Sequence, residues 1–200
     1  AMDLPHELLP YLRVPNAFGL PTWLSRFDFV LDEEGRIRMV EINADTPCFI
    51  VESFYANGVA AEYFGRRDPN AGARTQLRDF LTQIHAHLAA PVADLTKGTL
   101  PPRPFVFSCF DDYPEDLANT RFLMQLMQEG APHGDIRFLS FYEMEIDERG
   151  IPLADSAYTS ALYRLHPMEI LIDERTAGGE PLGAMFLDLY KEGKFALMNP

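Results

Sequence analysis

The chain has 200 residues, 47% of them hydrophobic, which is enough for one ordinary domain or two small ones around a sizeable core. Its formal net charge of −13 argues against nucleic-acid partners, because a phosphate backbone is bound by a basic surface. The same charge favours a polycationic small molecule such as a polyamine.

The cysteines and the apolar runs indicate the compartment. Cys48 and Cys109 lie far apart without a CxxC pattern, which predicts reduced thiols in a cytoplasmic protein and no thiolate metal site. No apolar run approaches the ~20 residues of a membrane span, and the start of the chain lacks a signal-peptide pattern, so we expect no membrane partner. Ala1 before Met2 suggests the remnant of a tag, and the ending at Asn199-Pro200 without a polar tail suggests a piece of a longer protein.

The segment from Pro5 to Leu12 is predicted to form a short helix, and Val14 to Trp23 a loop. A β-hairpin follows. Its first strand alternates apolar and acidic residues from Arg26 onward, its second strand is the apolar run from Ile37 to Ile42, and the turn between them is Asp32-Glu33-Glu34-Gly35.

Three polar side chains of this hairpin are predicted to share one face. Residues two apart on a strand point the same way, so Glu41 and Asn43 lie together, and Asp28 joins them if it pairs with Glu41. This register also sets Asp32 opposite Ile37 and leaves a four-residue loop. A slip of one residue would send Asp28 to the other face.

Two carboxylates and an amide oxygen are hard ligands, typical of Mg²⁺ that holds the phosphates of a nucleotide. Arg26 could then clamp a transferring phosphoryl group. The alternative is a solvated hairpin edge whose acids face water, and the spacing alone does not decide between the two.

The strings RFDF and VEINADTP resemble the magnesium hairpin of the glutathionylspermidine synthase family, a group of ATP-grasp ligases. The resemblance implies that ATP phosphorylates a carboxylate and that an amine then displaces the phosphate to form an amide. It also implies that Arg26, Phe27 and Asp28 contact ATP, with Arg26 as a catalytic residue. Asp28, Glu41 and Asn43 would hold Mg²⁺.

A turn and a second helix follow the hairpin. The helix is predicted from Phe49 to Phe64, interrupted at Gly58, with Thr46 and Cys48 at its entrance. Free N–H groups and the positive end of the helix dipole suit a substrate carboxylate or phosphate there.

The resemblance implies two small hydroxyl residues at this turn, which bind the carboxylate-bearing peptide. Thr46 keeps the hydroxyl and Cys48 does not, a departure that bears on the identity of the acyl substrate. The alternative role for Thr46 is a helix cap beside Pro47.

A polar linker from Arg66 to Ala73 is the first candidate boundary. Beyond it, a helix is predicted from Thr75 to Ala89, because apolar residues recur at helical spacing at Leu77, Leu81, Ile84 and Leu88. His85 and His87 diverge on that helix and are not a metal pair.

A β-α-β unit is predicted next. It consists of a buried strand at Phe105 to Phe110, a helix from Glu115 to Glu129 stopped by Gly130, and a strand from Ile136 to Ile146. The acidic loop Asp111 to Asp116 then lies at the carboxyl end of the first strand, where ligands gather.

Four acids in six residues could seat an ammonium-bearing substrate, although acids in a first helical turn also complement the helix dipole. The resemblance implies that Glu115 and Asp116 contact the peptide and the polyamine. Asp116 stands where the family has glutamate, which shortens the reach by one methylene.

Further strands are predicted at Ile151 to Asp155 and at Ala161 to His166, and the chain closes with a helix from Leu182 to Tyr190 and a strand from Phe195 to Met198. The segment YRLHPME is similar to a family segment that lines the peptide site. Arg164 within it could pair with a substrate carboxylate or form a structural ion pair. Ile170 stands where the family has a hydroxyl.

We therefore expect an α/β fold in three segments: a magnesium-hairpin region of a permuted ATP-grasp core at 1–70, an α/β preATP-grasp-like substrate subdomain at 71–175, and a return to the core at 176–200. The expected function is that of an ATP-dependent carboxylate–amine ligase, or its substrate and magnesium part, with ATP and Mg²⁺ as cofactors. The alternatives are a non-catalytic polyamine- or peptide-binding module and, third, a hydrolase that uses the same carboxylates.

Phosphoryl transfer needs cations around the phosphates. The chain has three lysines, Lys97, Lys191 and Lys194, all remote in sequence from the hairpin. We therefore expect this chain alone to be inactive, and the nucleotide-gripping parts to lie beyond Pro200.

Overall fold

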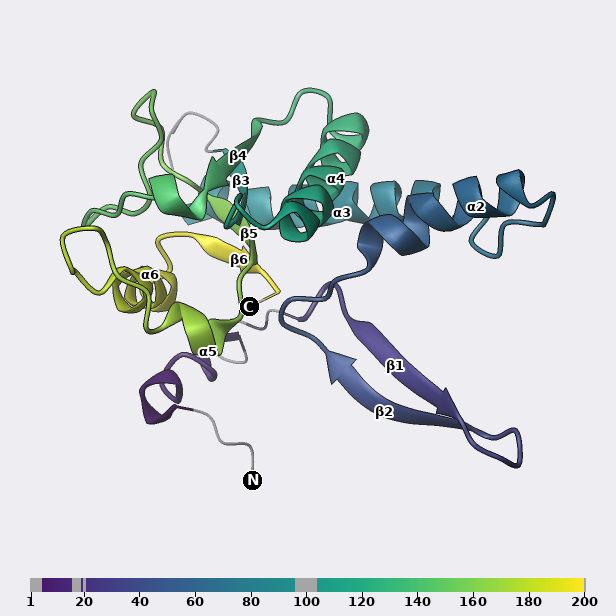
Figure 1. The fold of residues 1–200 in the computed structure, drawn as a ribbon. Helices are drawn as coiled ribbons and strands as arrows, with labels where there is room; N and C mark the ends of the chain where they lie inside the picture. The colour runs from purple at the N-terminus through teal and green to yellow at the C-terminus, as the bar shows by residue number, and fades with distance from the viewer. Residues whose placement is uncertain (1–4, 16–18, 20, 96–103, 200) are drawn as a thin grey trace.

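The computed structural model describes residues 5–15, 19, 21–95 and 104–199, with the backbone alone described at 89–95. The fold is mixed α/β, with a parallel four-stranded sheet and a separate antiparallel hairpin (Figure 1). The sheet has the order β4-β3-β5-β6. Its strands are β3 (Phe105–Cys109), β4 (Ile136–Ser140), β5 (Ala161–Leu165) and β6 (Ala196–Met198).

Helices cover both faces of this sheet, as parallel sheets require. The long helix α3 (Ala73–Leu95) and α4 (Pro114–Gly130) pack on one face, through a core that contains Leu81, Leu123 and Phe107. The short helix α5 (Met168–Leu171) and α6 (Leu182–Lys191) pack on the other face. The central strands β3 and β5 are therefore buried along their whole length.

The hairpin consists of β1 (Arg26–Leu31) and β2 (Ile37–Asn43), and it stands away from the α/β body in Figure 1. It joins the body at its base through the loop before β1 and the loop after β2. From that base the chain enters a helical segment that starts at Ile50, passes through a π-helical turn, η2 (Glu52–Ala56), and continues as α2 (Asn57–Tyr63).

The hairpin register confirms one predicted pair and corrects another. Asp28 lies opposite Glu41, as expected, but a bulge between Asp28 and Phe29 leaves Val40 unpaired. Ile37 therefore pairs with Leu31, and not with Asp32 as the regular register predicted. Asp32 instead closes the loop, where its N–H donates to the carbonyl of Arg36 at 3.0 Å.

Because of the bulge, the hairpin has one apolar face and one polar face. Because one residue of β2 is passed over, the apolar residues on both sides of the bulge face the same way. This apolar face consists of Phe27, Phe29, Leu31, Ile37, Met39 and Ile42, all of them largely exposed. The other face carries the polar residues Arg26, Asp28, Glu41 and Asn43.

The β-α-β unit is confirmed: β3 and β4 run parallel and α4 connects them. The second strand is shorter than predicted, since it ends at Ser140 and passes into the 3-10 helix η3 (Phe141–Glu143). The Ser140 side chain accepts from the N–H of Tyr142 and so stops the strand.

Three other elements differ from their predictions. The first helix is only the 3-10 turn η1 (His6–Leu8). Gly58 does not interrupt the second helix but lies inside α2, where a Cβ would meet the Asp68 carboxylate at 3.1 Å. The expected strand at 151–155 is reduced to a single bridge between Pro152 and Tyr158, because Leu153 turns the chain.

The last two elements belong to the same body as the β-α-β unit. The strand β6 pairs in parallel with β5, and α6 packs over the core beside β3 and β5. The three-segment division of the chain stays a prediction. Over the residues that the structure describes, no helix combines the length and apolar character that crossing a bilayer requires.

Candidate functional site

The polar face of the hairpin is organised by Arg26. Its guanidinium forks onto Asp28, with Nε 2.8 Å from Oδ1 and Nη2 2.9 Å from Oδ2, and lies 3.5 Å from Glu41 Oε1. The Arg26 hydrogen bonds hold the pKa of the Asp28 carboxyl below its usual range. Two carboxylates and one guanidinium therefore share this face.

Asn43, at the end of β2, shapes the loop that follows. Its Oδ1 accepts from the backbone N–H groups of Asp45 (3.3 Å) and Thr46 (3.1 Å), and its Nδ2 donates to the Thr46 carbonyl (3.2 Å). Both lone pairs of the amide oxygen are thus engaged. Asp28 and Glu41 offer free lone pairs to a cation. Within the described ranges, no three His, Cys, Asp or Glu residues form a group that could hold a metal ion.

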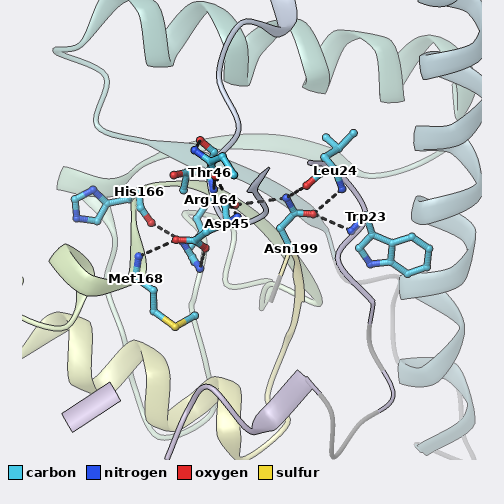
Figure 2. A network of polar contacts seen from close by, with 9 residues as sticks. Trp23, Leu24, Asp45, Thr46, Arg164, His166, Met168 and Asn199 are labelled. Atoms are coloured by element: carbon cyan, nitrogen blue, oxygen red, sulfur yellow. Dashed lines mark hydrogen bonds and ion pairs between the residues drawn. The ribbon is translucent and has the colours of Figure 1, made fainter. Parts of the chain in front are cut away.

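Asp45 ties this loop to the sheet, as Figure 2 shows. One of its oxygens accepts from Arg164 on β5 at 2.5 Å, and the other accepts from the N–H of Met168 at 3.0 Å. The Arg164 side chain has 0% exposure and also donates to the His166 carbonyl. Arg164 thus has an internal carboxylate partner in this structure. Its expected contact with a substrate stays a prediction.

Asn199, just after β6, anchors the segment that leads into β1 (Figure 2). Its Oδ1 accepts from the N–H groups of Trp23 (3.0 Å) and Leu24 (2.9 Å). Its Nδ2 donates to the carbonyls of Leu24 (2.7 Å) and Asp45 (3.4 Å). Asn199 and Arg164 together fix the hairpin base against the carboxyl edge of the sheet.

The helix after the loop starts at Ile50, not at Phe49, and its first two N–H groups already have a hydrogen-bond acceptor. Asn119 of α4 accepts from the N–H groups of Ile50 (2.9 Å) and Val51 (3.2 Å). The alternative role of Thr46 as a cap is therefore wrong. The backbone of Phe49 has a φ of 67°, the left-handed conformation that non-glycine residues adopt at a cost, and Phe49 lies under Arg26 at 5.6 Å.

The acidic first turn of α4 lies beside the Cys48 turn. Burial, and then the charges of Asp116 and Glu115, raise the pKa of the Cys48 thiol, against a smaller opposing effect of Arg26. Burial and the Glu115 charge likewise raise the pKa of Asp116. Glu52 also acts on Cys48, and its Oε2 is buried without a hydrogen-bond partner in the part of the chain that the structure describes.

These side chains meet at one edge of the sheet. The strands are parallel, so β3, β5 and β6 all end there, and the acidic loop, His166 and Asn199 follow them directly. The chain passes from β3 to β4 on one side and then to β5 on the other, and the point between β3 and β5 is where open α/β sheets bind ligands. The loop from Asn43 to Cys48 is held over that point by Arg164.

The predicted site residues divide into two groups. The structure brings Arg26, Glu115 and Asp116 each within electrostatic reach of Cys48. Phe27 lies apart from them, on the apolar face of the hairpin, where it is 52% exposed and stacks on Phe29 at 6.5 Å.

The sequence interpretation missed Asp45, Asn119 and Asn199. Asp45 lies within the string VEINADTP, but the sequence predicted no role for its side chain. Asn119 had a usable signal, because it lies four residues before Leu123 and seven before Leu126 on the buried stripe of α4, where an apolar residue is normal. Asn199 had no signal.

The lysines lie elsewhere. Lys191 lies over the Tyr11 ring at 5.8 Å, and Lys194 lies 4.0 Å from Glu192. Both belong to the end of α6 and the turn after it. Lys97 lies outside the described residues.

One comparison with known proteins identifies the family. A family model described as glutathionylspermidine synthase preATP-grasp matches residues 1–200, the whole chain. This match agrees with the resemblance carried by RFDF and VEINADTP. The chain therefore belongs to the glutathionylspermidine synthase preATP-grasp family.

Proposed function

We propose that this chain carries the substrate and magnesium part of an ATP-dependent carboxylate–amine ligase, with a hairpin that belongs to a permuted ATP-grasp core. In the proposed reaction a carboxylate oxygen attacks the γ-phosphorus of ATP, forming an acyl phosphate and releasing ADP. The nitrogen of an amine then attacks the acyl carbon. Phosphate leaves, the nitrogen loses a proton, and an amide results.

One observation carries this proposal: a cation-and-carboxylate face and an acidic amine-type site meet at the carboxyl edge of one sheet. Arg26 stands between them, since it binds Asp28 and lies within electrostatic reach of Cys48. A ligase of this kind needs a phosphoryl site and an amine site close together, because the amine must reach the acyl phosphate before water does.

We assign Mg²⁺ and the phosphates of ATP to the polar hairpin face. Asp28 and Glu41 are the fitting ligands, because their carboxylates are paired across the strands and are hard oxygen donors. Asn43 would join them only by releasing one of its two N–H partners. Bound Mg²⁺ would neutralise phosphate charge, while Arg26 would bind a phosphoryl oxygen and Phe27 would contact the nucleotide.

We assign the acyl substrate to the turn at Thr46 and Cys48. The raised pKa of Cys48 keeps its thiol protonated at neutral pH, so this residue serves as a weak donor and not as a nucleophile. Arg164 contributes by holding the loop through Asp45, and a direct substrate contact would require it to exchange that partner.

We assign the amine to Glu115 and Asp116, with Glu52 as a third carboxylate. Burial raises the pKa of Asp116, and the charge of the neighbouring Glu115 raises it further; a bound ammonium group offsets that charge repulsion. A polyamine supplies several such groups at once.

A non-catalytic polyamine-binding module is the second candidate, and the lysine positions favour it. Lys191 and Lys194 contact Tyr11 and Glu192 and have no contact with the hairpin acids. Thermal-shift measurements with Mg-nucleotide and with polyamines discriminate the two candidates. The substrate and magnesium part of a ligase should be stabilised by both ligands, whereas a polyamine-binding module should be stabilised by the polyamine alone.

Titration calorimetry with Mg-ATP tests the metal assignment. We expect Asp28→Asn and Glu41→Gln each to weaken binding at least about tenfold, since changes to outer-sphere partners alone cost metal sites that much. Glu34→Gln is the matched control, because Glu34 is an exposed acid of the same hairpin that contacts Arg36 in the loop. Unchanged affinity in both site variants would refute the assignment.

Spermidine binding at low and high salt tests the amine assignment. The double variant Glu115→Gln with Asp116→Asn should lose binding, and salt should weaken binding to the unaltered chain, because exposed charge pairs are screened within ~8 Å at physiological ionic strength. Asp112→Asn changes an acid of the same loop outside the proposed site. Equal losses in both variants would reduce the loop to a nonspecific acidic surface.

A further inference from the structure

Asn119 is a polar residue where the fold calls for an apolar one. It lies on α4 with 1% exposure, on the stripe that packs against the sheet. Asparagine is a poor helix former, because its side chain competes for backbone hydrogen bonds. A buried asparagine inside a helix therefore needs a compensating set of bonds, and this one has it.

The two ends of the Asn119 amide bind two different elements. Its oxygen accepts from the first two N–H groups of the helix that starts at Ile50, at 2.9 and 3.2 Å. Its nitrogen donates to the Glu115 carbonyl in its own first turn, at 3.0 Å. One planar side chain thereby spans the gap between the helix start at Ile50 and the start of α4.

Each element carries one half of the proposed site. The first half is the turn of Cys48, which reaches the helix start through the strained backbone of Phe49. The second half is the acidic pair Glu115 and Asp116. Asn119 bonds both elements, so the two halves are close in space; burial, and then the charges of these two acids, raise the pKa of the Cys48 thiol.

The helix start is also not free to bind an anion in the way its dipole suggests. The N–H groups of Ile50 and Val51, which would otherwise point at a carboxylate or phosphate, are taken by a neutral amide. A substrate anion at this turn must use other donors, whereas Asn119 uses these two for alignment.

We propose that Asn119 is a positioning residue that sets the distance between the acyl turn and the amine-binding acids of α4. The site assignments in this inference rest on the proposed function, but the alignment itself does not. Asn119 acts through Ile50 on one side and Glu115 on the other, without contact to the reacting groups.

The Cys48 thiol reports this alignment without any substrate. The experiment measures the pH dependence of Cys48 alkylation in a Cys109→Ala background, since Cys109 is fully buried and its own thiol must not contribute. Removing the acids, by Glu115→Gln with Asp116→Asn, should lower the Cys48 pKa toward its ordinary value.

The test is whether Asn119 is needed for that response. With Asn119→Leu, which keeps the shape and removes both bonds, the Cys48 pKa should already be lower, and removing the acids should then change it little. Asn119→Asp keeps the acceptor and should retain the response. Thr120→Val, at the neighbouring buried position, is the matched control and should behave as the unaltered chain.

Spermidine binding separates this inference from the proposed function. Asn119→Leu should weaken it roughly tenfold, the effect of misaligning one charge-assisted contact. The unaltered chain could fail to bind spermidine while the change in Cys48 pKa on acid removal still depends on Asn119. That result would refute the amine assignment and support the alignment by Asn119. If Asn119→Leu keeps the full response to acid removal, the inference is overturned. Asn119→Ser, which is too short to span the gap, decides the same question should the leucine variant fail to fold.

Discussion

Removing the Asp45 carboxylate should cost this protein a large part of its stability. Asp45→Ala leaves Arg164 with a fully buried guanidinium and no counter-charge, and it removes the acceptor of the Met168 N–H. Breaking a buried ion pair from one side costs about 3–5 kcal/mol, because the remaining charge stays desolvated. The Asp45 side chain is 35% exposed, so water reaches that end of the pair and the lower part of this range applies.

A loss of about 3–4 kcal/mol corresponds to a fall in Tm of about 6–16 °C, at roughly 2–4 °C per kcal/mol for a chain of this size. Urea denaturation measures it directly. The fluorescence of Trp23, the single tryptophan, reports the hairpin base, and circular dichroism reports the whole chain.

A double variant isolates the ion pair from other effects of the substitution. Arg164→Met removes the buried charge, so adding Asp45→Ala to it should cost much less than Asp45→Ala alone, and the two losses should not add. Additive losses, or an Asp45→Ala variant within about 0.5 kcal/mol of the unaltered chain, would refute the buried-charge argument.

Gly183→Ala should destabilise the fold by at least about 1–3 kcal/mol in the same urea assay, because a Cβ would lie 1.6 Å from the Leu171 carbonyl oxygen. Burial lowers the pKa of His166 below 6.5, so as pH falls the unfolded chain binds a proton on this imidazole before the folded chain does. The free energy of unfolding should therefore decline from pH 6.5 downward. His166→Gln should flatten part of that decline in a series of urea titrations. Arg26→Ala should let the pKa of Asp28 rise toward its usual range in a carboxyl NMR titration, with little change in stability because the pair is partly exposed; an unmoved pKa would contradict the fork between the two side chains.

The sequence was sufficient to predict the elements whose periodicity is strong. Alternation predicted the hairpin and the pairing of Asp28 with Glu41, and a continuous apolar run predicted β3. The β-α-β unit followed from the Pro114 start and the Gly130 stop of α4. These signals are local, so they survive without knowledge of the rest of the fold.

What the sequence could not predict depends on contacts between distant segments. The bulge at Val40 has no local signature, because any residue there fits a regular strand. The strand expected at 151–155 has a suitable composition, but among the described residues no neighbouring strand pairs with it along its length. The partners of Asp45 and Asn199 are over 100 positions away, and spacing says nothing at that separation.

The candidate site was predicted in its parts and not in its assembly. Motifs named Arg26, Cys48, Glu115 and Asp116 separately. That they share one edge of the sheet follows from the parallel topology together with two buried bonds, at Arg164 and at Asn119.

The bonds made by Asn199 have a consequence for synthesis on the ribosome. They link positions 175 and 176 residues apart, whereas the hairpin closes over a short loop and forms within roughly 1–10 μs. At roughly 5–20 residues per second, translation needs on the order of 8–30 s to proceed from the end of β2 to Asn199. Throughout that interval the hairpin segment lacks the Asn199 bonds that fix its first strand to the sheet, and its exposed apolar residues are open to chaperones.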